Sequence, residues 1–373
     1  MKKSLFTLAL AFFIQFSTLP AQNTFTAHFT PEEWKVEAEK YEFTTYKGKP
    51  ALYMENGTAL HKEASLQDGI IEFDISFNEA RRFMGVHFRK TDPLNYEEFY
   101  VRPHQSGNPD ATQYTPVFNG NAAWQLYHGE GHSAAYSYNF GEWIHVKLLI
   151  SGNQMDIFIN DMSQPFLHVH ELKMELAEGA IGFSNSLSGG YFANLTYTPM
   201  DAPQLMSKEK KHSPEAGIIT SWEVSPAFFS GNLKGVNSLK DLPDFKALKW
   251  ETAETEYSGL LNLSRFSEVG PNSNTILVRA QIESDRETVK RIELGYSDQV
   301  FAFVNGQLVY SGQNNFRSRD YRYLGTIGFF DAVYVPLKKG KNTVYFAISE
   351  NFGGWGIKAK ISEMKQPDLP STE

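Results

Sequence analysis

The sequence predicts an all-β protein of two β-sandwich (jelly-roll) domains in tandem after a signal peptide. Apolar and polar residues alternate strictly over residues 71–77, which is the period-2 pattern of a half-buried strand. Similar short runs recur along the chain between clusters of Gly, Asn, Pro and Asp, while helical periodicity is nearly absent. A polar, proline-bounded stretch at 199–214 separates two groups of these runs and is typical of a linker.

The composition excludes several classes of protein. The chain has 373 residues, 41% hydrophobic and 21% charged, which suits two folded domains rather than a disordered protein. Its formal charge of -8, from 35 basic and 43 acidic residues, provides no basic field for nucleic acid. The chain has no cysteine, so disulfides, thiolate metal sites and cysteine nucleophiles are excluded.

Residues 1–21 are predicted to be a signal peptide. Lys2 and Lys3 precede a mostly apolar run over 5–19, which ends before a small residue, Ala21. The run is too short and too interrupted to span a membrane, and no second apolar segment approaches that length. We therefore expect a periplasmic or secreted protein without a lipidated cysteine and without membrane insertion.

Strands are then predicted in both halves. The first domain is expected over 22–198, with strands at 71–77, 84–88, 99–102, 144–150, 155–159 and 192–197. The second is expected over 215–363, with strands at 275–282, 291–296, 300–304, 308–310, 333–337 and 343–348. Asn305-Gly306 lies between two of these strands and predicts a tight hairpin turn. Residues 364–373 are expected to form a tail.

The end of the first half resembles the concanavalin A-like, laminin G-like jelly-roll superfamily. The resemblance rests on a Trp-initiated strand, a strand ending at a polar turn, a Gly-Ile-Gly strand and a final Phe-x-Asn strand, at 143–147, 155–160, 179–183 and 191–195. Members of that superfamily include lectins, glycoside hydrolases, polysaccharide lyases and adhesion proteins, and their saccharides usually lie on the concave sheet face. The resemblance therefore implies the fold more firmly than the function.

The second half resembles the galactose-binding-like sandwiches of secreted bacterial glycan-degradation proteins. It carries a hairpin over 301–309, a Lys-Gly-Lys-Asn turn leading into a core strand at 338–344, and a Gly-Gly-Trp-Gly segment at 353–356. Together the two resemblances imply a component of polysaccharide breakdown.

One face of the first domain is predicted to concentrate cations and rings. Alternation places Met84, Val86 and Phe88 on one side of their strand and His87 and Arg89 on the other. The same sorting places Glu98, Tyr100 and Arg102 outward on the next strand, and His104 follows just past Pro103. If the two strands pair, one face carries five cations and rings, His87, Arg89, Tyr100, Arg102 and His104, which suits a sugar carboxylate or sulfate because Arg binds such groups through two hydrogen bonds. The alternative is a solvated face whose arginines pair with neighbouring acids.

The loop that follows supplies further candidate ligand-binding residues. Tyr114, Trp124 and Tyr127 offer flat surfaces for the C–H faces of sugars, and Asp110, Asn119 and His128 offer directional hydrogen bonds. In the second domain, Arg317 and Arg319 lie in a loop rich in cations and amides, and Trp355 lies among glycines. A core or interdomain role is the alternative for these residues.

No complete catalytic or metal motif is found. Glu72 and Asp74 resemble the start of a glucanase motif, but Phe77 follows where a second Glu would complete it. His168 and His170 share one strand face without a third ligand nearby in the sequence. We therefore expect no cofactor and no metal site, with a structural calcium ion allowed on fold grounds alone.

Three hypotheses follow, and the enzyme question stays open. The first is an exported carbohydrate-binding or accessory protein of a polysaccharide-utilisation system, whose ligand is an oligo- or polysaccharide that carries acidic or sulfate groups, and whose partners include other proteins of that system. The second is a glycoside hydrolase or polysaccharide lyase acting through Tyr100, Arg102, His104 and His128. The third is an adhesion module that binds a protein. The enzyme hypothesis would be favoured if its four residues and Asp110 converged in one cleft.

Overall fold

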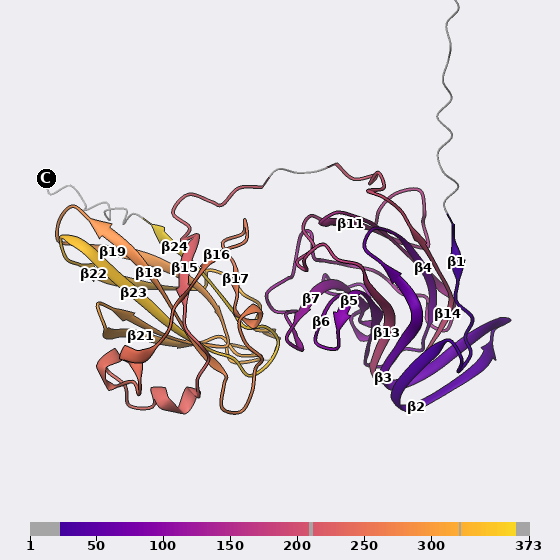
Figure 1. The fold of residues 1–373 in the computed structure, drawn as a ribbon, viewed down its shortest axis with the longest axis horizontal. Helices are drawn as coiled ribbons and strands as arrows, with labels where there is room; N and C mark the ends of the chain where they lie inside the picture. The colour runs from indigo at the N-terminus through magenta and orange to yellow at the C-terminus, as the bar shows by residue number, and fades with distance from the viewer. Residues whose placement is uncertain (1–22, 209–211, 321, 363–373) are drawn as a thin grey trace, which may run out of the picture.

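The computed structural model describes residues 23–208, 212–320 and 322–362 (Figure 1). These residues form two β-sandwiches, so the all-β fold class is confirmed. The predicted signal peptide and the predicted tail lie outside the described residues. The described helices are five short 3-10 turns: η1 (Pro103–Gln105), η2 (Ser230–Leu233), η3 (Leu239–Asp241), η4 (Phe245–Ala247) and η5 (Leu263–Arg265). In this part of the chain no helix is long and apolar enough to cross a membrane.

The N-terminal sandwich is one continuous antiparallel sheet of fourteen strands that folds over on itself. Its strands are β1 (Phe25–Thr26), β2 (Trp34–Tyr46), β3 (Lys49–Leu66), β4 (Gly69–Ser76), β5 (Arg82–Asp92), β6 (Asn95–Val101), β7 (Thr112–Phe118), β8 (Asn121–Ala122), β9 (Ser133–Ala134), β10 (Ile144–Ser151), β11 (Gln154–Ile159), β12 (Leu167–Val169), β13 (Gly179–Leu187) and β14 (Gly190–Pro199).

Strand β3 divides this sheet into two layers. Residues 51–54 of β3 pair with β14, whereas residues 57–66 pair with β13, so the two neighbours diverge from one long strand. The front layer continues from β13 through β5, β6 and β7, and the back layer continues from β14 through β4, β10 and β11. Phe73 and Ile75 of the back layer and Val86 and Phe88 of the front layer belong to one buried core. The apolar residues of each strand face this core, as the period-2 pattern predicts.

The C-terminal sandwich consists of two separate sheets. One has the order β16-β15-β18-β23-β20-β21 and the other the order β17-β24-β19-β22. The strands are β15 (Ser221–Val224), β16 (Glu251–Glu254), β17 (Leu261–Asn262), β18 (Thr275–Ser284), β19 (Thr288–Ser297), β20 (Gln299–Val304), β21 (Gln307–Gln313), β22 (Asp331–Leu337), β23 (Gly340–Ser349) and β24 (Gly356–Ser362). Trp222 and Trp355 are both buried in the core between the two sheets.

The predicted strands are confirmed, and the hairpin turn is as expected. Val304 pairs with Gln307, and both Asn305 (φ 50°) and Gly306 (φ 86°) take the left-handed backbone that such a turn requires. Several observed strands were not predicted, and the longest of them are β2, β3, β7 and β24; β7 occupies part of the segment that was predicted to be a loop. In β2 and β3 the alternation is blurred because charged residues occupy many positions, and β24 follows a glycine-rich segment that predicted a loop.

The two sandwiches contact each other directly. Gln125 of the N-terminal sandwich is fully buried; its backbone N–H donates to the Gly353 carbonyl at 2.8 Å and its carbonyl accepts from the Ile327 N–H at 2.9 Å. Buried Lys173 forms an ion pair with Glu256 of the C-terminal sandwich at 2.6 Å. These contacts fix loops of the second sandwich beside the front layer of the first.

Candidate functional site

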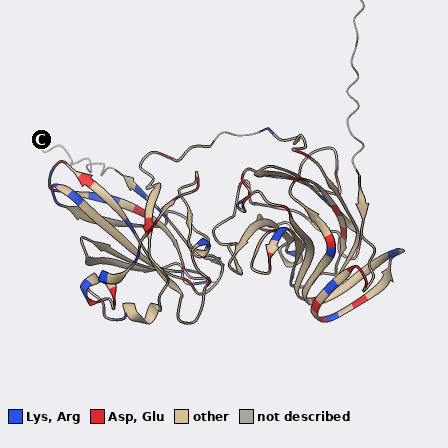
Figure 2. Ribbon diagram, viewed as in Figure 1, with Lys and Arg blue, Asp and Glu red and all other residues tan. Residues whose placement is uncertain are grey.

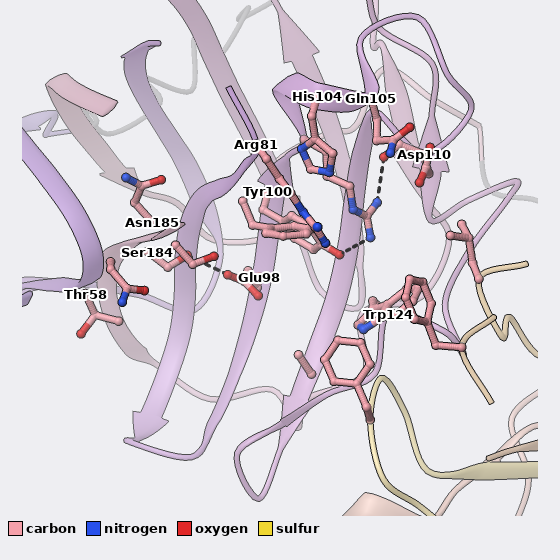
Figure 3. Close-up of a pocket in the computed structure, with 18 of the residues that line it drawn as sticks. Thr58, Arg81, Glu98, Tyr100, His104, Gln105, Asp110, Trp124, Ser184 and Asn185 are labelled. Atoms are coloured by element: carbon pink, nitrogen blue, oxygen red, sulfur yellow. Dashed lines mark hydrogen bonds between the residues drawn. The ribbon is translucent and has the colours of Figure 1, made fainter. Parts of the chain in front are cut away.

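A cleft of about 800 Å³ lies on the outward face of the front layer, where loops of the C-terminal sandwich cover one side (Figure 3). Its volume is in the range of small-molecule binding sites. Its lining residues come from both sandwiches: Asn56, Gly57, Thr58, Arg81, Phe83, Glu98, Tyr100, Arg102, His104, Gln105, Asp110, Ala122, Trp124, Ser184, Asn185, Ser186, Phe316, Arg317, Leu324 and Phe352.

Strand register builds the floor of the cleft. Ser184 on β13 pairs with Thr58 on β3 and with Gly85 on β5, and Gly85 pairs with Tyr100 on β6. Because directly paired residues point to the same face, Thr58, Ser184 and Tyr100 form one cross-strand row on the outward side. The row is polar except for Gly85, which has no room for a Cβ: that atom would lie 2.3 Å from the Phe99 carbonyl oxygen.

Arg102 is a buried cation whose hydrogen-bond partners are all neutral. Its Nη1 donates to the Asp110 carbonyl at 2.7 Å, and its Nη2 donates to the Tyr100 hydroxyl at 2.6 Å and to Gln113 Oε1. The residue is only 5% exposed. No carboxylate in the described part of the chain forms an ion pair with it, so its charge stays available to a ligand at the cleft surface.

Gln113 fixes this arrangement from below. Its Oε1 also accepts a hydrogen bond from the Tyr100 hydroxyl at 3.0 Å. Its Nε2 donates to the Trp124 carbonyl at 2.8 Å and to the Tyr127 carbonyl. One buried amide therefore positions both the cation and the turn that carries Trp124.

The titratable groups at this end of the cleft are shifted towards their neutral forms. Burial raises the pKa of Tyr100 well above its usual range. Burial, then the positive charges of Arg81 and Arg102, lower the pKa of His104, so its imidazole is neutral near pH 7. His104 Nδ1 is buried without a hydrogen-bond partner. This end of the cleft therefore presents two arginine cations beside two neutral rings.

Glu98 is the anionic residue of the floor. Its carboxylate accepts from the Ser184 hydroxyl at 2.8 Å (Figure 3) and lies 3.2 Å from His87 Nε2. Burial raises the pKa of Glu98, but the hydrogen bonds of His87 and Ser184 and the charges of His87 and Lys90 outweigh it, and the pKa is lowered overall. Glu98 is therefore ionised near pH 7.

Three rings form an aromatic wall between the sandwiches. Trp124 contacts Phe352 edge to face at a centroid distance of 5.8 Å and Phe316 at 6.4 Å, and the two phenylalanines lie 6.3 Å apart. Phe352 is 60% exposed. Two of the three rings belong to the C-terminal sandwich, so the cleft is complete only when both sandwiches are in place.

The charge of the cleft differs from that of the protein. Arg81, Arg102 and Arg317 give three positive charges against two negative charges from Glu98 and Asp110, so the lining sums to +1 with His104 neutral. The whole chain has a formal charge of -8. Figure 2 shows acidic and basic residues mixed over both sandwiches. The positive cleft is thus a local feature.

Six of the residues predicted from the sequence do line this cleft: Tyr100, Arg102, His104, Asp110, Trp124 and Arg317. The expected pairing of their two strands is observed, since β5 and β6 are antiparallel neighbours. His87 is on the same face but lies behind Glu98, where it stacks against Tyr96 at 4.2 Å.

Arg89 does not join the predicted face. The β5–β6 register shifts after Phe88, and Arg89 has a positive φ of 48°, which turns its side chain out of the alternation. The guanidinium instead forms an ion pair with Asp68 at 2.8 Å and donates to the Gly152 carbonyl at 2.6 Å. Arg89 is a buried structural residue.

The other predicted aromatic residues are buried elsewhere. Tyr114 faces the core, because it pairs with inward-facing Phe99, and its hydroxyl donates to Glu97 at 2.7 Å. Tyr127 donates to Glu256 across the domain interface at 2.5 Å. Trp355 is fully buried in the second core, where its Nε1 donates to the Ile348 carbonyl at 2.9 Å. Burial removes all three from any ligand.

The remaining predicted polar residues make structural contacts outside the cleft. Asn119 donates to the Ser264 carbonyl at 2.8 Å, and His128 Nε2 lies 3.0 Å from the Ile327 carbonyl oxygen, so both belong to the domain interface. Arg319 pairs with Asp331 at 2.5 Å.

The glucanase-like pair and the histidine pair are also away from the cleft. Glu72 and Asp74 lie on β4 in the back layer, and Asp74 binds Lys49 at 2.6 Å and His145 at 2.8 Å. His168 contacts Asp156 at 2.7 Å. Among the described residues, no group of three His, Asp or Glu side chains is arranged to hold a metal ion.

Sequence reasoning missed several lining residues. Alternation placed Glu98 outward, although as a partner for the arginines and not as a ligand-binding residue, and Phe83 has the same strand parity as His87, so alternation could have identified it too. Ser184 and Thr58 required the order of the strands, and Phe316 and Phe352 required the packing of the two sandwiches. Neither can be read from local sequence.

No protein-family model matches the sequence, and no curated protein matches it. Among solved structures, a carbohydrate-binding module, CBM66, from Bacillus subtilis is 16% identical with a TM-score of 0.32, over 46% of this chain and 93% of that chain. A Bacillus subtilis protein of unknown function with a galectin-like fold is 12% identical with a TM-score of 0.35, over 45% and 89%. A β-glucanase from Bacillus licheniformis is 10% identical with a TM-score of 0.34, over 48% and 99%. These proteins belong to the concanavalin A-like group of folds that the sequence resembles, and they carry no weight for the function of this chain.

Proposed function

We propose that the protein binds a saccharide bearing a carboxylate or sulfate group in the cleft between its two sandwiches, without cleaving it. The observation that carries this proposal is the combination in one cleft of an aromatic wall with a buried arginine that has no acidic partner. In an exported glycan-use system such a protein is an accessory binding component.

The two sides of the cleft suit the two sides of a sugar ring. Trp124, Phe316 and Phe352 offer apolar surface for axial C–H groups. The row of Thr58, Ser184 and Tyr100 offers hydroxyl groups. Sugars expose both kinds of surface, whereas a purely apolar ligand would leave these hydroxyl groups without partners.

Arg102 supports an anionic ligand. Two of its five N–H groups, on Nε and Nη1, are not used in the three hydrogen bonds described above. A carboxylate or sulfate beside them would neutralise a buried cation, and charge-assisted hydrogen bonds are stronger than neutral ones. Arg81 and Arg317 at the rim add attraction that salt would screen.

The geometry favours binding over hydrolysis. Among the described lining residues, the carboxylates are Glu98 and Asp110. Glu98 precedes Arg102 by four residues, and the backbone N–H of Arg102 donates to the carbonyl of Ala111 at 2.7 Å. Their backbones are therefore about 13 Å apart at roughly 3.3 Å per residue. Figure 3 shows the two carboxyl groups at different ends of the cleft, with Tyr100 between them and neither directed towards the other. A pair of catalytic carboxylates needs about 5 to 9.5 Å.

The geometry also disfavours a lyase that uses Tyr100 as its base. Such a tyrosine needs a lowered pKa, but burial raises the pKa of Tyr100, and its hydroxyl is held by Arg102 and Gln113. His104 has the neutral form that a base requires, so an unsaturated product that disappears in His104→Ala would establish a lyase instead.

The test is calorimetric titration with neutral, uronic-acid and sulfated oligosaccharides, followed by assays for new reducing and unsaturated ends. The proposal predicts binding without new ends, weakened about tenfold to a hundredfold in Trp124→Ala because truncating a central aromatic contact of a binding site costs roughly 1–3 kcal/mol. Trp250→Ala is the matched control, since Trp250 stacks on Arg279 outside the cleft. Equal binding by both variants would contradict the proposed site, and binding to no saccharide would contradict the function.

A further inference from the structure

Two carboxyl groups are buried side by side in the C-terminal sandwich, behind the loop that carries Phe352. Asp298 and Glu350 are each 1% exposed. The backbone N–H of Asp298 donates to the carbonyl of Ser349 at 2.9 Å, which places the two acids next to each other at the ends of β20 and β23. Neither forms an ion pair with a described residue.

Both carboxyl groups hold the backbone of the loop over 351–354. Asp298 Oδ2 accepts from the N–H groups of Asn351 at 3.0 Å and Phe352 at 3.2 Å. Glu350 Oε1 accepts from the N–H of Gly354 at 3.0 Å. The loop is thus attached to the second sandwich through three backbone bonds to these two side chains.

The same loop meets the cleft and the first sandwich. The Phe352 ring is part of the aromatic wall, and the Gly353 carbonyl accepts from the Gln125 N–H at 2.8 Å. Gly353 has a φ of 106°, and a Cβ there would lie 2.4 Å from Gln125 Oε1, so only glycine fits this close approach. Movement of the loop would therefore disturb both the wall and the interface.

The second oxygen of Glu350 favours a protonated pair. Glu350 Oε2 is buried without a hydrogen-bond partner. A charged carboxylate oxygen in that position would be costly, whereas a proton on it removes the charge. The groups packed around the pair, which include Ser297, Asn274 and Gln125, are uncharged. Burial, then the charge of Asp298, raise the pKa of Glu350 to about 8.

We infer that Asp298 and Glu350 hold one proton between them and act as positioning residues for the cleft, so that loss of this proton loosens the 351–354 loop and its aromatic ring. The pH-dependent opening of the loop is expected in the absence of any ligand. Only its effect on the affinity for a saccharide rests on the proposed function.

The direction of the pH dependence follows from proton linkage. When the loop is closed, the pair keeps a proton up to about pH 8. When the loop opens, water reaches the pair and the carboxyl pKa returns towards its usual value of 4.5. Between these two values the closed form binds one more proton than the open form, so opening is favoured by up to about tenfold per pH unit. Above pH 8 the dependence levels off.

Hydrogen exchange of the full chain tests this inference without a ligand. We expect the amides of Asn351, Phe352 and Gly354, corrected for intrinsic rates, to lose protection between pH 5 and 8 and to level off above. The profile should be flat in Glu350→Gln, which keeps the shape of the protonated acid. In Asp298→Asn it should level off at a lower pH, because that change removes the charge of Asp298 but leaves the burial of Glu350. Protection of β18 in the same sandwich serves as the internal control.

Two results would overturn the inference. One is a pH-independent wild-type profile, which decides the matter even if a variant fails to fold. The other is a wild-type slope that persists unchanged in Glu350→Gln. A saccharide that binds the wild type should lose affinity over the same pH range and should not do so in Glu350→Gln. If no saccharide binds but the exchange profile has the expected slope, the proposed function is wrong, whereas the inference that the two carboxyl groups share a proton and hold the loop is still supported.

Discussion

Replacing Gln125 by Ala should weaken the junction on which the cleft depends. The Gln125 side chain donates to the Leu324 carbonyl at 2.7 Å and accepts from the Ser297 hydroxyl at 3.0 Å, and the residue is fully buried. Alanine keeps the two backbone bonds to Gly353 and Ile327, but it removes the donor to the Leu324 carbonyl and leaves the Ser297 hydroxyl with only its longer contact to Asp298 Oδ1 at 3.4 Å. At roughly 1–3 kcal/mol for each buried group, the loss is about 3 kcal/mol. For sandwiches of this size that corresponds to a fall in Tm of roughly 6–12 °C.

Calorimetric unfolding of four proteins measures this effect. They are the wild type, Gln125→Ala, Ser297→Ala and the double variant. Because the two side chains share one hydrogen bond, the losses should be less than additive by about 1 kcal/mol. Gln307→Ala, in an exposed strand position, is the control and should change little. A Gln125→Ala protein as stable as the wild type, or strictly additive losses, would refute the reasoning.

Three further predictions concern charged groups. Lys173→Met should destabilise the protein by about 1–3 kcal/mol in urea unfolding, because Glu256 keeps only the Tyr127 hydroxyl and Arg265 at 3.8 Å as partners, and no loss of stability would contradict the contribution of this ion pair. Hydrogen bonds that His145 donates to Asp74 and Glu72 raise its pKa to about 9, so the stability that protonated His145 contributes is complete below pH 6.5 and is lost as the pH rises through 9. Because the His145 side chain is 38% exposed, we expect its contribution to the free energy of unfolding to be only about 1 kcal/mol. The difference in stability between the wild type and His145→Gln should therefore change with pH, and a difference that is constant with pH would contradict this prediction. Glu98→Gln should raise affinity for an anionic saccharide about twofold to fivefold in titration, since it removes a negative charge from the floor, and a fall in affinity would show that Glu98 contacts the ligand instead.

Period-2 alternation predicted the strands well because each sandwich has one buried and one exposed side. It also sorted Tyr100 and Arg102 to the outward face, since nothing interrupts β6 there. It failed at Arg89 because a shift in register and a positive φ follow Phe88, and the sequence carries no clear signal for either.

The composite nature of the cleft could not be predicted from the sequence. Trp355 among glycines suggested an exposed ring, but the glycines allow the chain to turn beside Gln125, and the ring that reaches the cleft is Phe352. Tyr127 and Asn119 were predicted to contact a ligand, but they lie in the domain interface. Their hydrogen-bond partners, Glu256 and Ser264, are 129 and 145 residues away in the sequence and belong to the second sandwich. Long-range packing decides which polar residues stay free for a ligand.

The central claim is that the cleft binds an anionic saccharide without cleaving it. The most direct measurement is calorimetric titration of the full chain and of two variants, Arg317→Ala and Arg319→Ala, with one oligosaccharide in neutral, uronic-acid and sulfated forms. Arg317 lines the cleft, whereas Arg319, two residues away, is paired with Asp331 outside it. We expect the anionic forms to bind more tightly than the neutral one, Arg317→Ala alone to reduce this preference, and no new chain ends to form. Equal binding of all three forms, equal effects of the two variants, or cleavage of the saccharide would contradict it.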